Sequence, residues 1–288
     1  MSNYVILMDV SGDIVPESIE KWGLKFIPMQ YSLGEEMRTS YGPESDDLMK
    51  KFYDGQRKGD LTKTSQITPY LYEEYFEPYL KEGKSILYLC LSSGLSSTYS
   101  AACLAKESLK EKYPDLDVFP VDSLAATGGM GVLIEEALKN REAGMSIEEN
   151  KNALEALVPK IKHWFLVQDL MYLKRGGRVS SATAVVGSML NIKPILKIDE
   201  TGHLATIAKK HGNKAAVHAL FEYFKASFNE ELTKTVYICD ADARELALVL
   251  AAEVKKEFPN VEIKHTTLCP IIGAHTGPGM VAICHIGK

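Results

Sequence analysis

The chain has 288 residues, of which 45% are hydrophobic and 25% are charged, and its formal net charge is −5. This composition is typical of a globular protein with one large or two ordinary domains. The acidic balance argues against a nucleic-acid-binding protein, because the overall field does not attract phosphate groups. We expect the basic cluster Lys209-Lys210-His211 to be the solvated end of a strand.

Three further classes of protein find no support in the sequence. No apolar run approaches the ~20 residues that cross a bilayer. The first segment, Met1–Met8, lacks the basic region of a signal peptide. The five cysteines form no C-x-x-C pair and no cluster with zinc spacing. We therefore expect buried, reduced thiols in a cytoplasmic protein without a metal centre.

The first half of the sequence alternates apolar strand patterns with helix patterns. Extended segments are expected at Tyr4–Met8, Leu24–Leu33, Ser85–Leu91 and Val118–Val121. Helices are expected from Pro16, at Pro43–Lys58, from Thr68-Pro69 to Lys81, from the Ser92–Tyr99 loop through Glu111, from Gly128, and from Ser146. The last of these starts with the capping-box pattern Ser146-Ile-Glu-Glu149.

The second half predicts more strands and a hairpin. Strands are expected at Trp164–Val167, Ile192–Ile198, Leu204–Lys210, Val236–Asp240, Val261–Thr266 and Met280–Ile286, the second and third of them joined by Asp199–His203. Helices are expected from near Asp169, at Asn213–Phe228 and at Ala241–Phe258. A loop that contains His275 is expected between the last two strands.

This order of elements predicts an α/β protein with two domains. The expected N-terminal domain, residues 1–160, has three layers with a mainly parallel sheet, and the C-terminal domain, residues 161–288, is α/β with a mixed sheet. Ligands bind beyond the carboxyl ends of the strands in open α/β sheets. Three polar segments lie near the end of an expected strand or precede an expected helix: Asp9-Val-Ser11, Thr64-Ser-Gln66 and Asp122-Ser123.

Three glycine-containing segments have the residue types of an anion-binding pocket. Lys174-Arg-Gly-Gly-Arg178 and Gly273-Ala-His-Thr-Gly-Pro-Gly279 place cations or a histidine beside glycines that allow close backbone approach. The Ser92–Thr98 segment adds hydroxyls at the start of a helix, where backbone N–H groups favour an anion. The same residues also have structural interpretations, since serines cap helices, arginines brace a domain seam and histidines pack in cores.

Catalytic and cofactor sites are less well supported. A serine esterase or acyltransferase that uses Ser96 or Ser93 is the alternative function, because Gly94-Leu-Ser96 resembles the start of the nucleophile elbow G-x-S-x-G. The segment lacks the final glycine of that motif. No P-loop and no G-x-G-x-x-G follows a strand, and the seven histidines show no i, i+4 pairing. We expect neither a nucleotide cofactor nor a metal.

Four motifs together resemble the DegV family of bacterial fatty-acid-binding proteins. They are Thr64-Ser65-Gln66, Ser92-Ser-Gly-Leu-Ser-Ser-Thr-Tyr99, Tyr172-Leu-Lys-Arg-Gly-Gly-Arg178 and Gly273-Ala-His-Thr-Gly-Pro-Gly279. The resemblance covers almost the whole chain and includes Asp9-x-Ser11 and Ile192-Lys-Pro-Ile195. The string around Arg175 is the most specific of these motifs.

The resemblance implies a non-catalytic carrier that holds one long-chain fatty acid in an apolar tunnel between two domains. It assigns the carboxylate to Thr64, Ser65, Ser96, Arg175 and His275, with Ser93 close by, and gives Arg178 a supporting role. It further implies a separate ATP-dependent fatty acid kinase that converts the bound acid to an acyl phosphate for phospholipid synthesis. A cytoplasmic carrier of this kind needs no cofactor and allows transient contact with a membrane.

The sequence departs from the family pattern at three places. Ser97 stands where the family usually has glycine, Ile67 where proline often follows, and Asp9-Val-Ser11 replaces Asp-Ser-Thr. None of these changes removes a proposed ligand-binding hydroxyl. A carrier for another amphipathic acid, such as a branched or bulky lipid, remains a third interpretation.

Overall fold

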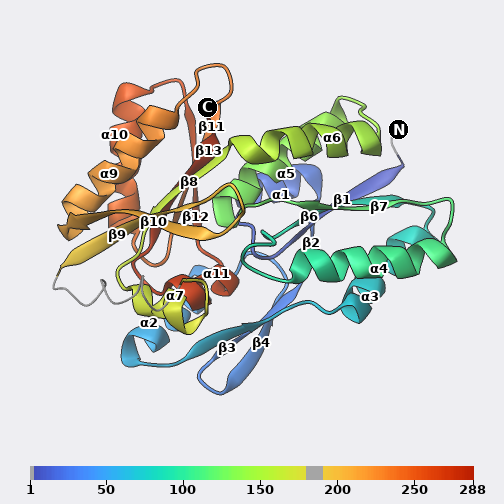
Figure 1. The fold of residues 1–288 in the computed structure, drawn as a ribbon, viewed down its shortest axis with the longest axis horizontal. Coiled ribbons are helices and arrows are strands. Elements are labelled where there is room, and N and C mark those ends of the chain that lie inside the picture. The colour runs from blue at the N-terminus through green and yellow to red at the C-terminus, as the bar shows by residue number, and fades with distance from the viewer. Residues whose placement is uncertain (1–2, 180–190) are drawn as a thin grey trace.

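The computed structural model describes residues 3–179 and 191–288. The strands of these residues form three sheets, and helices pack against them (Figure 1). The first sheet, with strand order β2-β1-β6-β7, is parallel throughout. Its strands are β1 (Tyr4–Asp9), β2 (Lys25–Ile27), β6 (Ser85–Cys90) and β7 (Val118–Asp122). The continuous apolar run of β6 is typical of a central strand covered on both faces.

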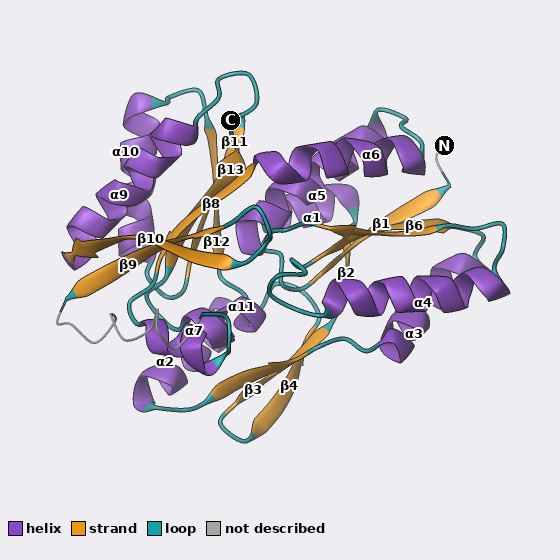
Figure 2. Ribbon diagram, in the orientation of Figure 1, coloured by secondary structure: helices purple, strands orange, loops and turns teal. Residues whose placement is uncertain are grey.

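Helices cover both faces of this parallel sheet (Figure 2). They are α1 (Pro16–Trp22), α3 (Pro69–Lys81), α4 (Thr98–Lys112), α5 (Thr127–Glu142) and α6 (Ile147–Leu157). Thr68 caps α3 by accepting a hydrogen bond from the Leu71 amide, and Ser146 and Glu149 form the expected capping box of α6. The three-layer arrangement predicted for the first half is confirmed.

The second half forms a mixed six-stranded sheet with strand order β10-β9-β8-β13-β11-β12. Its strands are β8 (Ile161–Leu166), β9 (Ile192–Ile198), β10 (Leu204–His211), β11 (Thr235–Asp240), β12 (Glu262–Thr267) and β13 (Val281–Ile286). The expected hairpin joins β9 and β10, and β11 pairs in parallel with β12. Helices α9 (Gly212–Ser227) and α10 (Arg244–Glu257) pack on one face of the sheet.

Helix α5 packs against the opposite face of the mixed sheet, at β11 and β13. One continuous hydrophobic core therefore contains residues of both large sheets and of the helix between them, such as Leu87 of β6, Ala282 of β13 and Met130 of α5. The short 3-10 helix Val158–Lys160 ends where the mixed sheet begins, which is the position of the boundary predicted from the sequence. The assignment of two domains stays a prediction, because the core continues across that boundary.

The sequence did not predict the third sheet, an antiparallel one with order β4-β3-β5. Pro28 divides the expected extended segment, so that β2 joins the parallel sheet while β3 (Met29–Leu33) pairs with β4 (Glu36–Ser40) and β5 (Thr62–Ser65). A two-residue connection with Gly34 at φ 60° joins β3 to β4. Helix α2 (Asp46–Lys58) follows β4 and ends at Gly59.

The prediction of a loop around His275 is wrong. Residues Pro270–Thr276 form the short helix α11, in which Pro270 occupies the first turn and His275 the last. Of the glycines that suggested a loop, Gly277 and Gly279 lie beyond the helix at φ 72° and 86°. No helix of the described ranges is long and apolar enough to cross a membrane.

Candidate ligand-binding cavity

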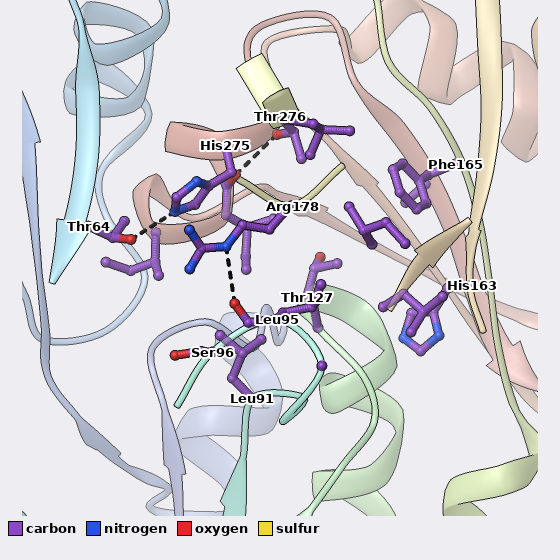
Figure 3. A pocket seen from close by; sticks show the side chains of 18 of the residues that line it. Thr64, Leu91, Leu95, Ser96, Thr127, His163, Phe165, Arg178, His275 and Thr276 are labelled. Carbon is purple, nitrogen blue, oxygen red and sulfur yellow. Dashed lines mark hydrogen bonds between the residues drawn. The ribbon is translucent and has the colours of Figure 1, made fainter. Parts of the chain in front are cut away.

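A cavity of about 520 Å³ lies between the parallel sheet, the mixed sheet and α11 (Figure 3). Its walls are mostly apolar. Strands of the mixed sheet and of the small sheet, helix α11 and the segments that follow β6 and β7 of the parallel sheet contribute to them. The apolar lining consists of Met29, Leu91, Leu95, Ala126, Phe165, Leu173, Ile198, Leu204, Ile271, Ile272, Met280, Ala282 and Cys284. The volume and lining are those of a site for a small organic ligand.

Strand alternation brings the deep part of the lining to one face of the mixed sheet. His163 and Phe165 of β8 are two residues apart, and Ala282 and Cys284 of β13 are their antiparallel partners. Side chains two residues apart on a strand point to the same face. The cavity thus follows these two strands inward from Met280.

Hydroxyl and imidazole groups gather at the other end of the cavity. Thr64, the third residue of β5, forms a 2.8 Å hydrogen bond between its Oγ1 and His275 Nε2. Ser96, in the β6–α4 loop, has its hydroxyl bonded to that of Thr98. Ser65 and Ser93 also line the cavity, at its exposed side.

Arg178 supplies the cation of this polar end. Its Nε donates a 3.1 Å hydrogen bond to the Leu95 carbonyl, and its guanidinium also donates to the Gly176 carbonyl. Burial lowers the pKa of Arg178, but an arginine in a protein stays protonated. Arg178 therefore faces the hydroxyls as a fixed positive charge.

Arg175, which the sequence resemblance assigns to the carboxylate, is not among the described residues that line the cavity. It is the last residue of α7 (Leu170–Arg175), and its guanidinium lies 4.6 Å from the centre of the Tyr172 ring. Arg178, and not Arg175, is among the described residues that line the cavity. The structure therefore assigns the cation of the polar end to Arg178.

His275 is neutral in this environment. Burial, reinforced by the positive charge of Arg178, lowers the pKa of His275 to about 4. Its Nδ1 is buried without a hydrogen-bond partner among the described residues. A Cβ at Gly176 would overlap this nitrogen, so only glycine lets the end of α7 approach the ring so closely.

The β6–α4 loop is fixed by the hairpin of the mixed sheet. Ser92 Oγ donates a 2.8 Å hydrogen bond to the Gly202 carbonyl and accepts one from the Gly94 amide. A Cβ at Gly94 would lie 2.5 Å from the Gly202 backbone, so a side chain at this position would separate the two loops. Close contact between the loop after β6 and the turn that joins β9 to β10 thus sets the position of Ser96.

Helix α11 is fixed from the opposite side, by α2 and β5. Tyr53 donates a 3.0 Å hydrogen bond to the Leu268 carbonyl, and Gln56 donates one of the same length to the Gly273 carbonyl. Thr62 donates to the Ala274 carbonyl at 2.8 Å. These contacts place His275 beside Thr64, and the one from Thr62 comes from the small sheet that the sequence did not predict.

Two polar lining residues, Thr127 and His163, lie outside the motifs identified in the sequence. Thr127 is the first residue of α5 and has a φ of 47°, which is unusual for a β-branched side chain. Neither residue has a motif around it. The alternation of His163 with Phe165 in β8 was the one available signal, and it does not distinguish a lining residue from a core residue.

Among the described residues that line the cavity, no serine is hydrogen-bonded to a histidine. The hydroxyl of Ser96 is bonded to Thr98, and His275 Nε2 is bonded to Thr64 rather than to a serine. A serine hydrolase needs its histidine within hydrogen-bond reach of the nucleophile. In residues 3–179 and 191–288, no group of three or more His, Cys, Asp or Glu side chains could hold a metal ion.

The fold and cavity define the class of this protein: two packed α/β halves enclose an amphipathic site. The described residues at its polar end supply hydroxyls, an imidazole and the guanidinium of Arg178. Within that class, the chain belongs to the DegV family. It matches the family model described as "Uncharacterised protein, DegV family" over residues 3–288.

Relatives of known sequence and structure agree with this assignment. The chain is 35% identical to the DegV domain-containing protein CPE0026 of Clostridium perfringens, covering 100% of this chain and 98% of that protein. A DegV lipid-binding protein of Thermotoga maritima superposes with a TM-score of 0.85 at 28% identity, with all of both chains covered. A fatty-acid-binding DegV family protein of Thermus thermophilus superposes with a TM-score of 0.87 at 26% identity, covering 99% of this chain and 100% of that one.

Proposed function

We propose that this protein binds one long-chain fatty acid, with the carboxylate at the polar end of the cavity and the acyl chain along its apolar walls. The observation that carries the proposal is the amphipathic lining, with Thr64, Ser96, His275 and Arg178 at one end and apolar side chains beyond them. The fatty-acid and lipid binding of the two solved relatives supports it.

The energetics of the site favour such a ligand. A buried carboxylate is costly unless hydrogen bonds and a cation compensate its charge, and two hydroxyls and a guanidinium are available here. Each buried methylene contributes about 0.8 kcal/mol, so a long acyl chain outweighs the cost of ordering the ligand. A neutral His275 can donate to a carboxylate without requiring a second buried charge.

We further propose that the bound carboxylate is presented to a separate ATP-dependent fatty acid kinase. The resemblance to the DegV family implies this partner. In the structure the residues beside the polar end, Ser65, Gln66, Ser93 and Ser97, are exposed and line the cavity. A carboxylate held there lies next to solvent, where a second protein can reach it.

The first test is extraction of the freshly purified protein under denaturing conditions, followed by mass spectrometry of the extract. A near-stoichiometric long-chain acid would support the proposal. Protein that yields no lipid and does not take up added oleate or palmitate would contradict it. Turnover of p-nitrophenyl acyl esters that is lost in Ser96→Ala would instead support the esterase alternative.

The head-group assignment has its own test. We expect Ser96→Ala and His275→Ala to weaken binding by about 1–3 kcal/mol, because each removes a hydrogen-bond partner and leaves the bound carboxylate with an unsatisfied oxygen. Titration with a fluorescent fatty acid measures the change. Unchanged affinity in both variants would contradict this placement of the carboxylate. The kinase step is tested by acyl-phosphate formation that requires the loaded protein, the kinase and ATP together.

A further inference from the structure

Two polar side chains, Thr127 and His163, lie at the distal end of the cavity. Thr127 Oγ1 and His163 Nε2 are both buried and unpartnered among the described residues. The side chains are 4% and 3% exposed. An unpaired buried polar group costs free energy, so such groups in a cavity are expected to meet a polar group of the ligand or a water molecule.

The two groups lie away from the proposed carboxylate site. His163 pairs with Cys284 in the register of β8 and β13, which is two residues deeper than the pair Phe165 and Ala282. Figure 3 shows His163 on the opposite side of the cavity from Thr64 and His275, with Thr127 between them. An acid bound by its carboxylate would therefore bring the distal part of its chain to this end.

Both side chains are held firmly in place. The ring of His163 lies against Gly129 of α5, where a Cβ would overlap Nε2. Thr127 donates its backbone amide to the Ser11 carbonyl at 2.9 Å. Its hydroxyl is close enough to Asp13 to lower the pKa of that carboxyl, against the larger effect of burial. Even if the hydroxyl turns toward Asp13, its oxygen can still accept a hydrogen bond.

The charge of the side chains at the distal end of the cavity determines which ligand groups can bind there. Burial lowers the pKa of His163 to about 4, against a smaller opposing effect of a hydrogen bond to the Ala126 backbone. The imidazole is therefore neutral at pH 7, with one donor and one acceptor nitrogen, and the bond to Ala126 occupies one of them. Of the described residues that line the cavity, Arg178 is the cation, and it lies at the other end. A second carboxylate would be unpaired here, whereas a hydroxyl or keto oxygen would match the donors and acceptors available.

We infer that Thr127 and His163 form a second polar subsite of the cavity, which recognises a hydroxyl or keto oxygen in the distal half of a long acyl chain. This inference rests on the proposed function, because the carboxylate must be fixed at Arg178 for the chain to reach the subsite. The protein then prefers an oxygenated fatty acid over the unsubstituted acid of the same length.

The test is a competition experiment in which a bound fluorescent fatty acid is displaced by stearate or by hydroxystearates. The hydroxyl moves stepwise along the distal half of the chain in the series. We expect at least one isomer to bind about tenfold more tightly than stearate, which corresponds to one well-formed buried hydrogen bond. We expect His163→Leu and the nearly isosteric Thr127→Val each to remove this preference while still binding stearate.

Phe165→Leu is the matched control, since it changes a neighbouring apolar wall and should leave the preference for oxygen in place. If stearate binds and no hydroxystearate binds more tightly, the inference is wrong and the proposed function stands. If the preference persists in both Thr127→Val and His163→Leu, the subsite is not formed by these residues. If neither stearate nor any hydroxystearate binds, the proposed function fails as well.

Discussion

At the scale of single residues, two arginines three positions apart have different surroundings. Arg175 ends α7 and stacks on Tyr172, whereas Arg178 bonds to the Leu95 carbonyl inside the cavity. The sequence motif contains both and does not show which one faces a ligand, because the turn at Gly176 and Gly177 reverses the chain between them. Gly177 has a φ of 75°, which allows this turn.

The contrast gives a matched pair of variants. We expect Arg178→Gln to weaken fatty acid binding by about 2 kcal/mol, because it removes the charge that compensates the carboxylate. We expect Arg175→Gln to change affinity by less than about 0.5 kcal/mol, since its guanidinium lies outside the cavity lining. Isothermal titration with oleate measures both. Equal losses, or a larger loss for Arg175→Gln, would restore the assignment that the sequence resemblance favours.

Most of the proposed site residues could be named from sequence, since Thr64, Ser65, Ser93, Ser96 and His275 all line one cavity. Each belongs to a short motif with glycines or hydroxyls, which a sequence displays directly. Thr127 and His163 could not be found this way. Their position depends on the packing of α5 against β8 and β13, which joins segments far apart in the chain.

At the scale of elements, the predicted bounds agree best with the structure where the hydrophobic pattern of a strand or helix continues along the whole segment. The strands of the parallel sheet and the hairpin of β9 and β10 agree with the prediction to within a residue or two at most ends. The small sheet was missed because β4 and β5 are short and polar, with Glu36, Lys63 and Thr64 among their residues. Such strands are stabilised by pairing and by contacts with α11, not by an apolar pattern.

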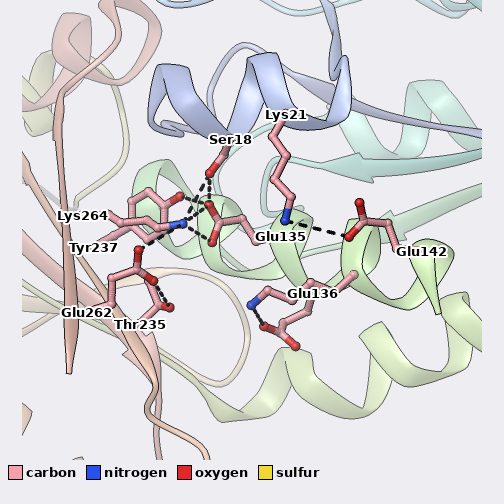
Figure 4. A network of polar contacts seen from close by, with 10 residues as sticks. Ser18, Lys21, Glu135, Glu136, Glu142, Thr235, Tyr237, Glu262 and Lys264 are labelled. Carbon is pink, nitrogen blue, oxygen red and sulfur yellow. Dashed lines mark hydrogen bonds and ion pairs between the residues drawn. The ribbon is translucent and has the colours of Figure 1, made fainter. Parts of the chain in front are cut away.

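A buried ion pair connects α5 to β12 (Figure 4). Lys264 Nζ lies 2.6 and 2.8 Å from the two carboxylate oxygens of Glu135, which is 2% exposed. Tyr237 donates a 2.7 Å hydrogen bond to the same carboxylate, and Ser18 donates another. The pair thus fixes the helix between the two large sheets, which together enclose the cavity.

Removing one partner of this pair should destabilise the fold strongly. We expect Lys264→Met to lower the free energy of unfolding by about 3–5 kcal/mol, because it leaves the Glu135 carboxylate buried without a counter-charge. The double variant Glu135→Leu/Lys264→Met should recover much of that loss. Lys50→Met, at the exposed pair with Asp54, is the control and should cost less than about 1 kcal/mol. Urea denaturation measures all three, and a small effect of Lys264→Met would contradict the argument.

At the scale of the whole molecule, buried titratable groups make stability depend on pH. Burial lowers the pKa values of His163 and His275 to about 4 and that of His285 to about 3. Unfolding returns each imidazole to its ordinary value near 6.5, so below that pH the unfolded chain binds more protons than the folded one. The stability that these groups contribute is complete above pH 6.5 and is lost as the pH falls.

Asp13 acts in the opposite direction. Burial raises its pKa to about 7, so the folded protein keeps a proton that the unfolded chain releases above pH 3.8. Its contribution to stability is present at low pH and is lost as the pH rises toward 7. Each group changes the free energy of unfolding by at most about 1.4 kcal/mol per pH unit. Burial also raises the pKa values of Asp9 and Asp240. Hydrogen bonds, in contrast, lower the pKa values of Glu73, Glu77 and Asp199, which adds to the effect of the three histidines.

We expect the free energy of unfolding to decrease as the pH is lowered from about 6.5 to about 4. Urea denaturation followed by circular dichroism at fixed pH values measures the slope. His285→Leu should make the slope shallower, because this imidazole is buried against Phe224 outside the cavity and loses its proton-linked contribution without disturbing the ligand site. His211→Gln, at an exposed position of β10, should leave the slope unchanged. A slope that is flat in the unmodified protein, or equal in the protein and His285→Leu, would show that these histidines take up protons at the same pH in the folded and unfolded states, and would contradict the argument.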